Sequence, residues 1–397
     1  MREDCDAIVA GHICLDIIPT LMGGDFQFAP GRLLEVGPAV MGTGGPVSNT
    51  GLALHRLGIK TRLMGKVGAD DFGQAIKRIV ARQDPALTGG MIEIPEEVTS
   101  FSIILNPPGS DRMFLHCPGC NETFGADDID YSLLSGARLF HFGYPPLLKK
   151  VIENDGVQLV DIFRRAKATG VTTSLDMSMP DPNSFSGRVN WRAILASTLP
   201  YVDIYLPSIE ETLFTLYPSE FRRLTTKPDG MRAAVRPESL GAISADLLSM
   251  GPSVVGLKLG PSGFYLKTAT RETFARFGRA IPATLPAWAE RELWSPCFQA
   301  NVVGTTGAGD ATIAGFLAAL LRDCPPEDCA TMACAVGGCN VEAADAVSGL
   351  LSWEDTTSRL HSGWPRRELY LELRGWFRCE RTGVWRGPAD KPAGTRS

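Results

Sequence analysis

The sequence lacks any apolar run close to the ~20 residues that a membrane-spanning helix needs. It also lacks a basic excess, because 39 Lys and Arg face 44 Asp and Glu, a net charge of −5. Nucleic-acid binding needs a basic face, so this balance argues against a nucleic-acid partner. The first residues, Met1–Asp6, are acidic and lead into a strand pattern, unlike a signal peptide. We therefore expect a cytoplasmic protein without a membrane or nucleic-acid partner.

A repeating cysteine spacing is absent as well. Ten cysteines are scattered over 397 residues, too sparsely for a disulfide framework, so we expect most of them to be small buried side chains. Cys117 and Cys120 form a CxxC pair, and no second pair completes a zinc site. We interpret this pair as incidental and place it in a loop.

Short apolar strand patterns alternate with helical patterns through most of the chain. Strands are expected at 6–11, 63–68, 139–142, 171–176, 202–206 and 254–258, and helices at 48–57, 72–80, 157–168 and 209–216. This alternation is typical of an α/β fold with a mainly parallel sheet covered on both faces. Segments 33–40, 99–105 and 112–116 are strand-like without helices between neighbours, which predicts a small antiparallel sheet that projects from the core.

Two stretches interrupt the alternation and look like insertions. Residues 217–238 are charged and contain several prolines, and residues 268–296 are rich in Arg, Ala and Trp. The tail from about residue 364 is rich in Arg and Trp and ends in Pro, Gly and Lys, which predicts a packed appendage with a frayed end. We therefore assign residues 1–363 to the main domain and 364–397 to a C-terminal extension.

The most informative stretch is GTTGAGDATIAGF, from Gly304 to Phe316. Residues 307–309 predict a tight turn whose N–H groups bind an anion at a helix N-terminus. Asp310 then lies in the first turn of that helix, beside the anion. A carboxylate there would only repel a phosphate, unless it takes a proton from an attacking hydroxyl. The arrangement therefore predicts phosphoryl transfer to an alcohol.

A second group of polar residues lies near the N-terminus. Asp16 follows the first expected strand, and parallel sheets bind ligands beyond the C-terminal ends of their strands. Gly44 and Gly45 let the backbone approach a ligand closely, and the amide of Asn49 both donates and accepts hydrogen bonds. This combination suits the hydroxyl groups of a sugar.

These motifs, in this order, resemble the ribokinase/PfkB family of carbohydrate kinases from about residue 6 to residue 349. The segments GKVGADDFG (65–73), GCN (119–121) and KLGPSG (258–263) add to the resemblance. It implies a ribokinase-like three-layer sandwich with a mainly parallel central sheet and a small antiparallel β lid, whose strands lie within about 17–45 and 98–117. It further implies a sugar as the substrate, ATP as the phosphoryl donor and Mg²⁺ as the metal.

The resemblance also implies a role for each matching residue. It makes Asp310 the catalytic base, with the anion hole formed by Gly307, Ala308 and Gly309. The sugar would be held by Asp16, Gly44, Gly45 and Asn49. The nucleotide side would be formed by Lys258, Gly260 and Gly263, and the magnesium would be held with the help of Glu211.

Three positions depart from the pattern of the family. Ser208 stands where the Asn-x-x-Glu motif has its asparagine. Gly304 stands where many members have an aspartate that helps hold a monovalent cation, so a dependence on K⁺ stays open. Gly143 stands where ribokinase carries a sugar-binding carboxylate, so ribose is not implied.

Two alternatives to a sugar kinase stay open at this level. One is a nucleoside or other small-alcohol kinase on the same fold, and the other is a catalytically weak ligand-binding or regulatory relative. A dinucleotide-binding dehydrogenase is disfavoured, because no GxGxxG follows the first strand. The lid sheets of some relatives pair into dimers, so a homodimer through the lid is compatible with the resemblance.

Overall fold

The computed structural model describes residues 5–21, 30–106, 113–226, 235–369 and 373–391. Its strands are β1 (Ala7–Gly11), β2 (Cys14–Pro19), β3 (Ala39–Gly44), β4 (Thr61–Met64), β5 (Lys66–Gly68), β6 (Ile92–Ile94), β7 (Phe101–Leu105), β8 (Met113–Cys117), β9 (Leu139–Gly143), β10 (Thr172–Leu175), β11 (Ile204–Tyr205), β12 (Val254–Lys258), β13 (Phe264–Thr268), β14 (Glu292–Ser295), β15 (Phe377–Arg378) and β16 (Trp385–Arg386). Its α-helices are α1 (Pro46–Arg56), α2 (Asp71–Ala81), α3 (Tyr131–Leu134), α4 (Lys149–Ile152), α5 (Val157–Ala168), α6 (Trp191–Thr198), α7 (Ile209–Leu216), α8 (Pro218–Thr225), α10 (Pro237–Ser249), α11 (Leu285–Trp288), α12 (Ala308–Leu321), α13 (Pro326–Asn340) and α14 (Trp353–His361).

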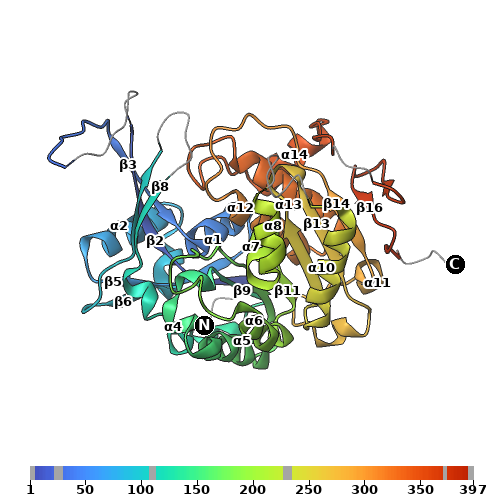
Figure 1. Cartoon of the computed structure of the whole chain (residues 1–397), viewed down its shortest axis with the longest axis horizontal. Helices are drawn as coiled ribbons and strands as arrows, with labels where there is room; N and C mark the ends of the chain where they lie inside the picture. The colour runs from blue at the N-terminus through green and yellow to red at the C-terminus, as the bar shows by residue number, and fades with distance from the viewer. Residues whose placement is uncertain (1–4, 22–29, 107–112, 227–234, 370–372, 392–397) are drawn as a thin grey trace.

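A central ten-stranded sheet carries the fold, in the order β15-β16-β14-β13-β12-β11-β10-β9-β1-β4 (Figure 1). All strands from β12 to β4 are parallel to their neighbours. The strands on the other side of β12 are antiparallel. The expected α/β fold with a mainly parallel sheet is thus confirmed.

Both faces of the central sheet are buried along its parallel strands, which explains why these strands are apolar runs without alternation. In β1, Ala7 and Val9 pack into one hydrophobic core together with α1, α12 and α13. Ile8 and Ala10 point to the other face and pack with α5, α6 and α7. The predicted helices at 157–168 and 209–216 are α5 and α7. No helix in the described parts of the chain is long and apolar enough to cross a membrane.

The expected small sheet is present, and we call it the lid sheet. Its order is β3-β2-β7-β8, and it lies on the side of the molecule opposite to the C-terminal strands (Figure 1). Its two outer pairings are antiparallel, whereas β2 and β7 at its centre run parallel.

Two strand predictions near the lid were wrong. The segment 33–40 contains strand only from Ala39, because Leu33 is fully in solvent and Pro38 has no N–H to donate to a ladder. The segment 63–68 is not one strand but the end of β4 and the whole of β5, which belong to different sheets. The chain changes sheets at Gly65, where a Cβ atom would lie 2.9 Å from Ile13. Apolar composition alone does not reveal such a change of partner.

The insertion predicted at 268–296 was also wrong in part. This stretch contains β14, which pairs with β13 inside the central sheet. The sequence analysis missed β13 as well, because its residues follow directly on the glycine loop at 260–263. The other stretch, 217–238, contains α8 and the start of α10, and residues 227–234 lie outside the described residues.

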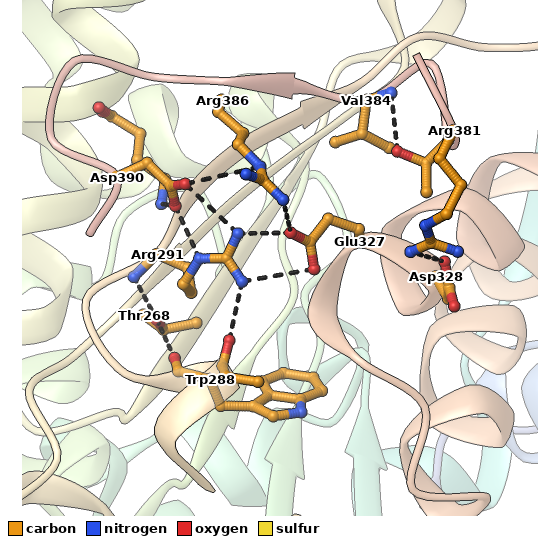
Figure 2. A network of polar contacts seen from close by, with 12 residues as sticks. Thr268, Trp288, Arg291, Glu327, Asp328, Arg381, Val384, Arg386 and Asp390 are labelled. Atoms are coloured by element: carbon orange, nitrogen blue, oxygen red, sulfur yellow. Dashed lines mark hydrogen bonds and ion pairs between the residues drawn. The ribbon is translucent and has the colours of Figure 1, made fainter. Parts of the chain in front are cut away.

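The C-terminal extension packs onto the central sheet through β16, which pairs with β14. Figure 2 shows Arg291 between Glu327 and Asp390 in a network of polar contacts. The guanidinium of Arg291 lies 2.8 Å from Asp390 and 2.5 Å from Glu327, and Arg386 lies 2.9 Å from Glu327. The side chains of Arg291 and Asp390 are each 2% exposed, so this network fastens the tail to the core. The domain boundary at 363/364 stays a prediction.

All ten cysteines are free thiols, five of them buried and five partly buried. Cys117 ends β8, and the thiol of Cys120 donates to the carbonyl of Lys66 at 3.0 Å. The thiol of Cys120 therefore has a structural contact.

We expect Asp390→Asn to lower the free energy of unfolding by about 3 kcal/mol, because it removes one of the two negative charges that contact the buried guanidinium of Arg291. Urea unfolding measures this loss as a shift in the midpoint. Lys391→Gln is the matched control, since it breaks the exposed ion pair with Glu290 one residue further on, and exposed pairs contribute only about 0–1 kcal/mol. Equal midpoint shifts in both variants would contradict the role assigned to the network.

Candidate active site

A cavity of about 870 Å³ opens between the central sheet and the lid sheet. It lies beyond the C-terminal ends of β1 and β9, where parallel sheets bind ligands. The structure brings several predicted site residues together in its wall: Asp16, Gly44, Gly45, Asn49, Gly307 and Asp310. The other predicted residues lie outside this wall: Glu211, Lys258, Gly260, Gly263, Ala308 and Gly309.

Asp310 lies in the first turn of α12 and is 1% exposed. The helix is preceded by Gly307, whose φ of 71° is in the left-handed region that favours glycine. The carboxylate accepts three hydrogen bonds, from Asn49 Nδ2 at 3.0 Å, Tyr144 Oη at 2.9 Å and Thr50 Oγ1 at 3.2 Å. These donors fix its orientation toward the cavity.

Burial raises the pKa of Asp310 above its usual value. The hydrogen bond from Asn49 and the positive charge of Lys258 oppose this effect, followed by the hydrogen bonds from Tyr144 and Thr50. A raised pKa makes a carboxylate a stronger base, and the opposing donors and cation favour its ionised form. The site therefore contains a carboxylate with the properties of a general base.

The sequence analysis missed Tyr144 as a site residue. It follows Gly143 at the end of β9 and adopts a left-handed conformation, with φ of 61°, which is rare for a residue with a side chain. That conformation accompanies the contact between its hydroxyl and the carboxylate of Asp310. No sequence signal marks Tyr144, because its neighbour in space is 166 residues away.

A second charged group lies behind the turn that precedes α12. Lys258 ends β12, and its Nζ lies 2.5 Å from Oδ1 of Asp176, just past the end of β10. A Cβ atom on Gly309 would lie 3.7 Å from the same Nζ, so the ammonium group is next to the predicted anion site. The other oxygen of Asp176 is buried and has no hydrogen-bond partner among the described residues. The sequence analysis named the strand that Asp176 ends but not the residue itself.

Three carboxylates act on Lys258, those of Asp176, Glu211 and Asp310. Burial alone would lower its pKa, but Asp176 and Glu211, with a smaller effect of Asp310, raise it above the usual value. Burial raises the pKa of Asp176 and of Glu211, and the charge of Lys258 opposes this in both. The ammonium group therefore stays charged and holds together carboxylates that would otherwise repel one another.

The two glycines before α1 make room for side chains of the cavity wall. A Cβ atom on Gly44 would lie 2.5 Å from Oδ2 of Asp16. A Cβ atom on Gly45, whose φ is 88°, would lie 2.5 Å from Nδ1 of His12. Any larger residue at either position would displace these side chains.

The glycines of the 258–263 loop have a different role. Gly260 and Gly263 adopt φ values of 53° and 101° in the turn between β12 and β13. A Cβ atom on Gly263 would lie 2.0 Å from the carbonyl oxygen of Ser295, so the loop packs tightly on the end of β14. This packing places the loop against the antiparallel part of the sheet.

Two of the three departures from the family pattern have local explanations. Ser208 caps α7: its hydroxyl accepts from the N–H of Glu211 at 3.2 Å, and the carboxylate of Glu211 accepts from the N–H of Ser208 at 2.6 Å. Gly304 lies against the carbonyls of Ala343 and Ala344, 2.9 and 3.0 Å from where its Cβ would be. A side chain at 304 would therefore require this turn to move.

Within the described residues, no group of three or more His, Cys, Asp or Glu side chains is placed to hold a metal ion. A metal in this site would thus need ligands from a bound substrate besides the carboxylates of the protein.

Residues 6–353 match the sequence pattern of the family described as pfkB family carbohydrate kinase. An uncharacterized sugar kinase of Archaeoglobus fulgidus is 27% identical over 299 residues, which cover 75% of this chain and 98% of that protein. A ribokinase of Arabidopsis thaliana, solved with ribose and ATP, superposes with a TM-score of 0.64 at 18% identity, over 90% of this chain and 99% of that one. A putative ribokinase II of E. coli, solved with ATP and Mg²⁺, superposes with a TM-score of 0.63 at 18% identity over the same shares. These structures confirm the ribokinase-like fold.

The charged group behind α12 predicts a stability that depends on pH. Lys258→Met leaves Asp176 without its cation, so the pKa of Asp176 rises further above its unfolded value of ~4. A carboxyl with a raised folded-state pKa favours the folded state at low pH, and this contribution is lost as pH rises toward that pKa. We expect the melting temperature of the variant to fall further below that of the native chain at pH 8 than at pH 5.

The double variant Lys258→Met/Asp176→Asn provides the control for this measurement. Because the amide does not titrate, the part of the extra loss at pH 8 that comes from Asp176 should disappear, while the part from Glu211 and Asp310 remains. An unchanged pH-dependent loss in the double variant would contradict the assigned pairing.

Proposed function

The chain belongs to the pfkB family of carbohydrate kinases, and we propose that it transfers the γ-phosphoryl group of ATP to a sugar hydroxyl with Asp310 as the general base. One observation carries the proposal: the oriented carboxylate of Asp310 faces the same cavity as Asp16 and the backbone of Gly44 and Gly45. An acceptor held by the latter residues lies within reach of the base.

In the proposed reaction, Asp310 takes the proton of the sugar hydroxyl. The hydroxyl oxygen forms a bond to the γ-phosphorus, and the bond from that phosphorus to the bridging oxygen of ADP breaks. The N–H groups of Gly307, Ala308 and Gly309 would stabilise the charge on the transferring group. Lys258 supports the same role, because its ammonium group lies next to Gly309.

The sugar would be held by Asp16 and Asn49, with the bare backbone of Gly44 and Gly45 against it. Asn49 already donates one hydrogen bond to Asp310, so it links the sugar position to the base. The loop with Gly260 and Gly263 would form the nucleotide side.

Asp176 and Glu211 fit a magnesium ion, because one is a buried and the other a partly buried carboxylate, and one oxygen of Asp176 lacks a hydrogen-bond partner in the described residues. When bound with the nucleotide, Mg²⁺ neutralises phosphate charge. The carboxylate of Glu211 is restrained by its capping contact with Ser208. We therefore assign Asp176, not Glu211, as the carboxylate that would contact the magnesium ion directly.

We expect Asp310→Asn to lose about 100- to 10,000-fold in kcat with its melting temperature nearly unchanged, because the amide cannot accept the proton. ADP release over a panel of sugars, sugar acids and nucleosides measures the rate, and parallel assays in K⁺ and in Na⁺ report any dependence on a monovalent cation. Asp127→Asn is the matched control, since that carboxylate is exposed and remote from the cavity. Full turnover by Asp310→Asn would refute the assignment.

We further propose that the lid sheet pairs two chains into a homodimer. Its edge strands β3 and β8 expose the apolar side chains of Val40, Met41, Met113 and Leu115, each 45–58% accessible. Several exposed apolar side chains on one small sheet favour an interface there.

Sedimentation equilibrium should give the mass of two chains, and Leu115→Glu should give the mass of one, because it places a charge in the apolar interface. Val157→Glu is the control, since Val157 is equally exposed but lies on α5. A native chain that sediments as a monomer at all concentrations rules the dimer out.

A further inference from the structure

His12 is a buried polar residue of the cavity wall that the proposed reaction does not use. Its side chain lines the cavity but is only 2% exposed. Neither ring nitrogen has a hydrogen-bond partner among the described residues. An unpaired buried polar group costs about 1–3 kcal/mol, so a ring with two of them is expected to serve a ligand.

The position of His12 is fixed by its backbone. Its N–H donates to the carbonyl of Gly143 at 3.5 Å, and its carbonyl accepts from Val47 at 3.3 Å. Its ring packs against Gly45, which has no Cβ atom to exclude it. The imidazole is thus held in place before any ligand binds.

His12 lies between the base and the lid. Its ring centroid is 6.3 Å from that of Tyr144, whose hydroxyl contacts Asp310, and 5.6 Å from that of His116 on β8. His116 Nδ1 in turn lies 3.0 Å from the hydroxyl of Ser102 on β7. A continuous polar wall therefore runs from the catalytic carboxylate to the lid sheet.

His12 is neutral at pH 7. Burial lowers the pKa of His12 to about 3, with a further contribution from His116, and burial also lowers the pKa of His116. A neutral imidazole presents one donor and one acceptor. This pair matches a hydroxyl group, which also donates and accepts.

The charges around the cavity also favour a neutral ligand. Its described lining includes four carboxylate residues and one basic residue: Asp16, Glu122, Asp181, Asp310 and Lys149. Lys149 is exposed, at the start of α4. Apart from the transferring phosphoryl group, a second anion in this cavity would face mainly negative charge.

We propose that His12 is a specificity-determining residue, which pairs with a sugar hydroxyl other than the phosphorylated one, because Tyr144 lies between His12 and Asp310. The cavity then takes a neutral, unphosphorylated sugar or polyol in preference to a sugar phosphate or a sugar acid. This inference rests on the proposed function, because it takes the cavity to be the sugar site. It names the substrate class, which the base and the anion turn do not.

The first experiment compares matched acceptors on the full chain with ATP and Mg²⁺. Each neutral ketose, aldose or polyol is assayed beside its own monophosphate and its own acid. We expect kcat/KM to be at least about tenfold higher for the neutral member of the preferred set, since each 1.4 kcal/mol of repulsion gives a factor of ten. A sugar phosphate or sugar acid as the preferred acceptor overturns the inference.

The second experiment tests the residue with the preferred sugar. His12→Leu removes both polar atoms and should raise KM about tenfold while kcat changes little, because a lost neutral hydrogen bond weakens binding without touching the reacting atoms. His12→Gln keeps a donor and an acceptor and should recover part of the loss. His361→Leu, on the exposed end of α14, is the control.

The outcomes separate the two proposals. The melting temperature of each variant is measured first, so that misfolding is not mistaken for lost recognition. An unchanged KM in folded His12→Leu overturns the role of His12 and leaves Asp310 as the base. If no acceptor gives turnover, the proposed function fails, and the specificity is then judged by the sugar-induced rise in melting temperature. A rise with neutral sugars that His12→Leu abolishes supports the inference, and its absence overturns it.

Discussion

Burial of helix α12 is the constraint on which the rest of this structure depends. The helix is apolar on all sides, and every residue from Ile313 to Leu321 is buried, between α1 and α13. Gly315 allows this close packing, since a Cβ atom there would lie 2.6 Å from the carbonyl of Met332. A helix fixed in this way holds its N-terminal turn rigidly. The orientation of Asp310 and of the N–H groups at 307–309 therefore follows from packing far from the cavity.

The charges at this turn are stabilised by one another. Asp310 and Asp176 are buried and Glu211 is partly buried, and the loss of solvent raises the pKa of each carboxyl. Lys258 opposes that effect at all three, and hydrogen bonds from Asn49, Tyr144 and Thr50 oppose it at Asp310. A phosphate group bound here, as the proposed function requires, would be tolerated because the cluster already contains a cation and the positive end of a helix. In the proposed mechanism, the same balance keeps the base ionised but strongly basic.

The cavity has one wall at the ends of central-sheet strands and another on the lid sheet. The central sheet contributes His12 and Tyr144, while the lid sheet contributes Asp16 and His116. Tyr144 is held in an unfavourable backbone conformation, a feature often found where function, not stability, determines the structure. The hydroxyl of Tyr144 donates a hydrogen bond to the carboxylate of Asp310, which would receive the proton of the sugar. A bound sugar hydroxyl and Tyr144 would therefore contact the same carboxylate.

The sequence by itself determined the elements that depend on local patterns. Buried strands, the helices at 157–168 and 209–216 and the glycine turn before Asp310 follow from composition and spacing within a few residues, and the ordered motifs gave the family. Partners distant in sequence needed the tertiary structure. Only the packing of α12 in the fold brings Asp310 to Tyr144, and only the order of β10, β11 and β12 in the central sheet brings Asp176 to Lys258. The change of sheet at Gly65 and the pairing of β14 with the tail were hidden for the same reason: an apolar run shows that a strand is buried, but the choice of its neighbour depends on the whole fold.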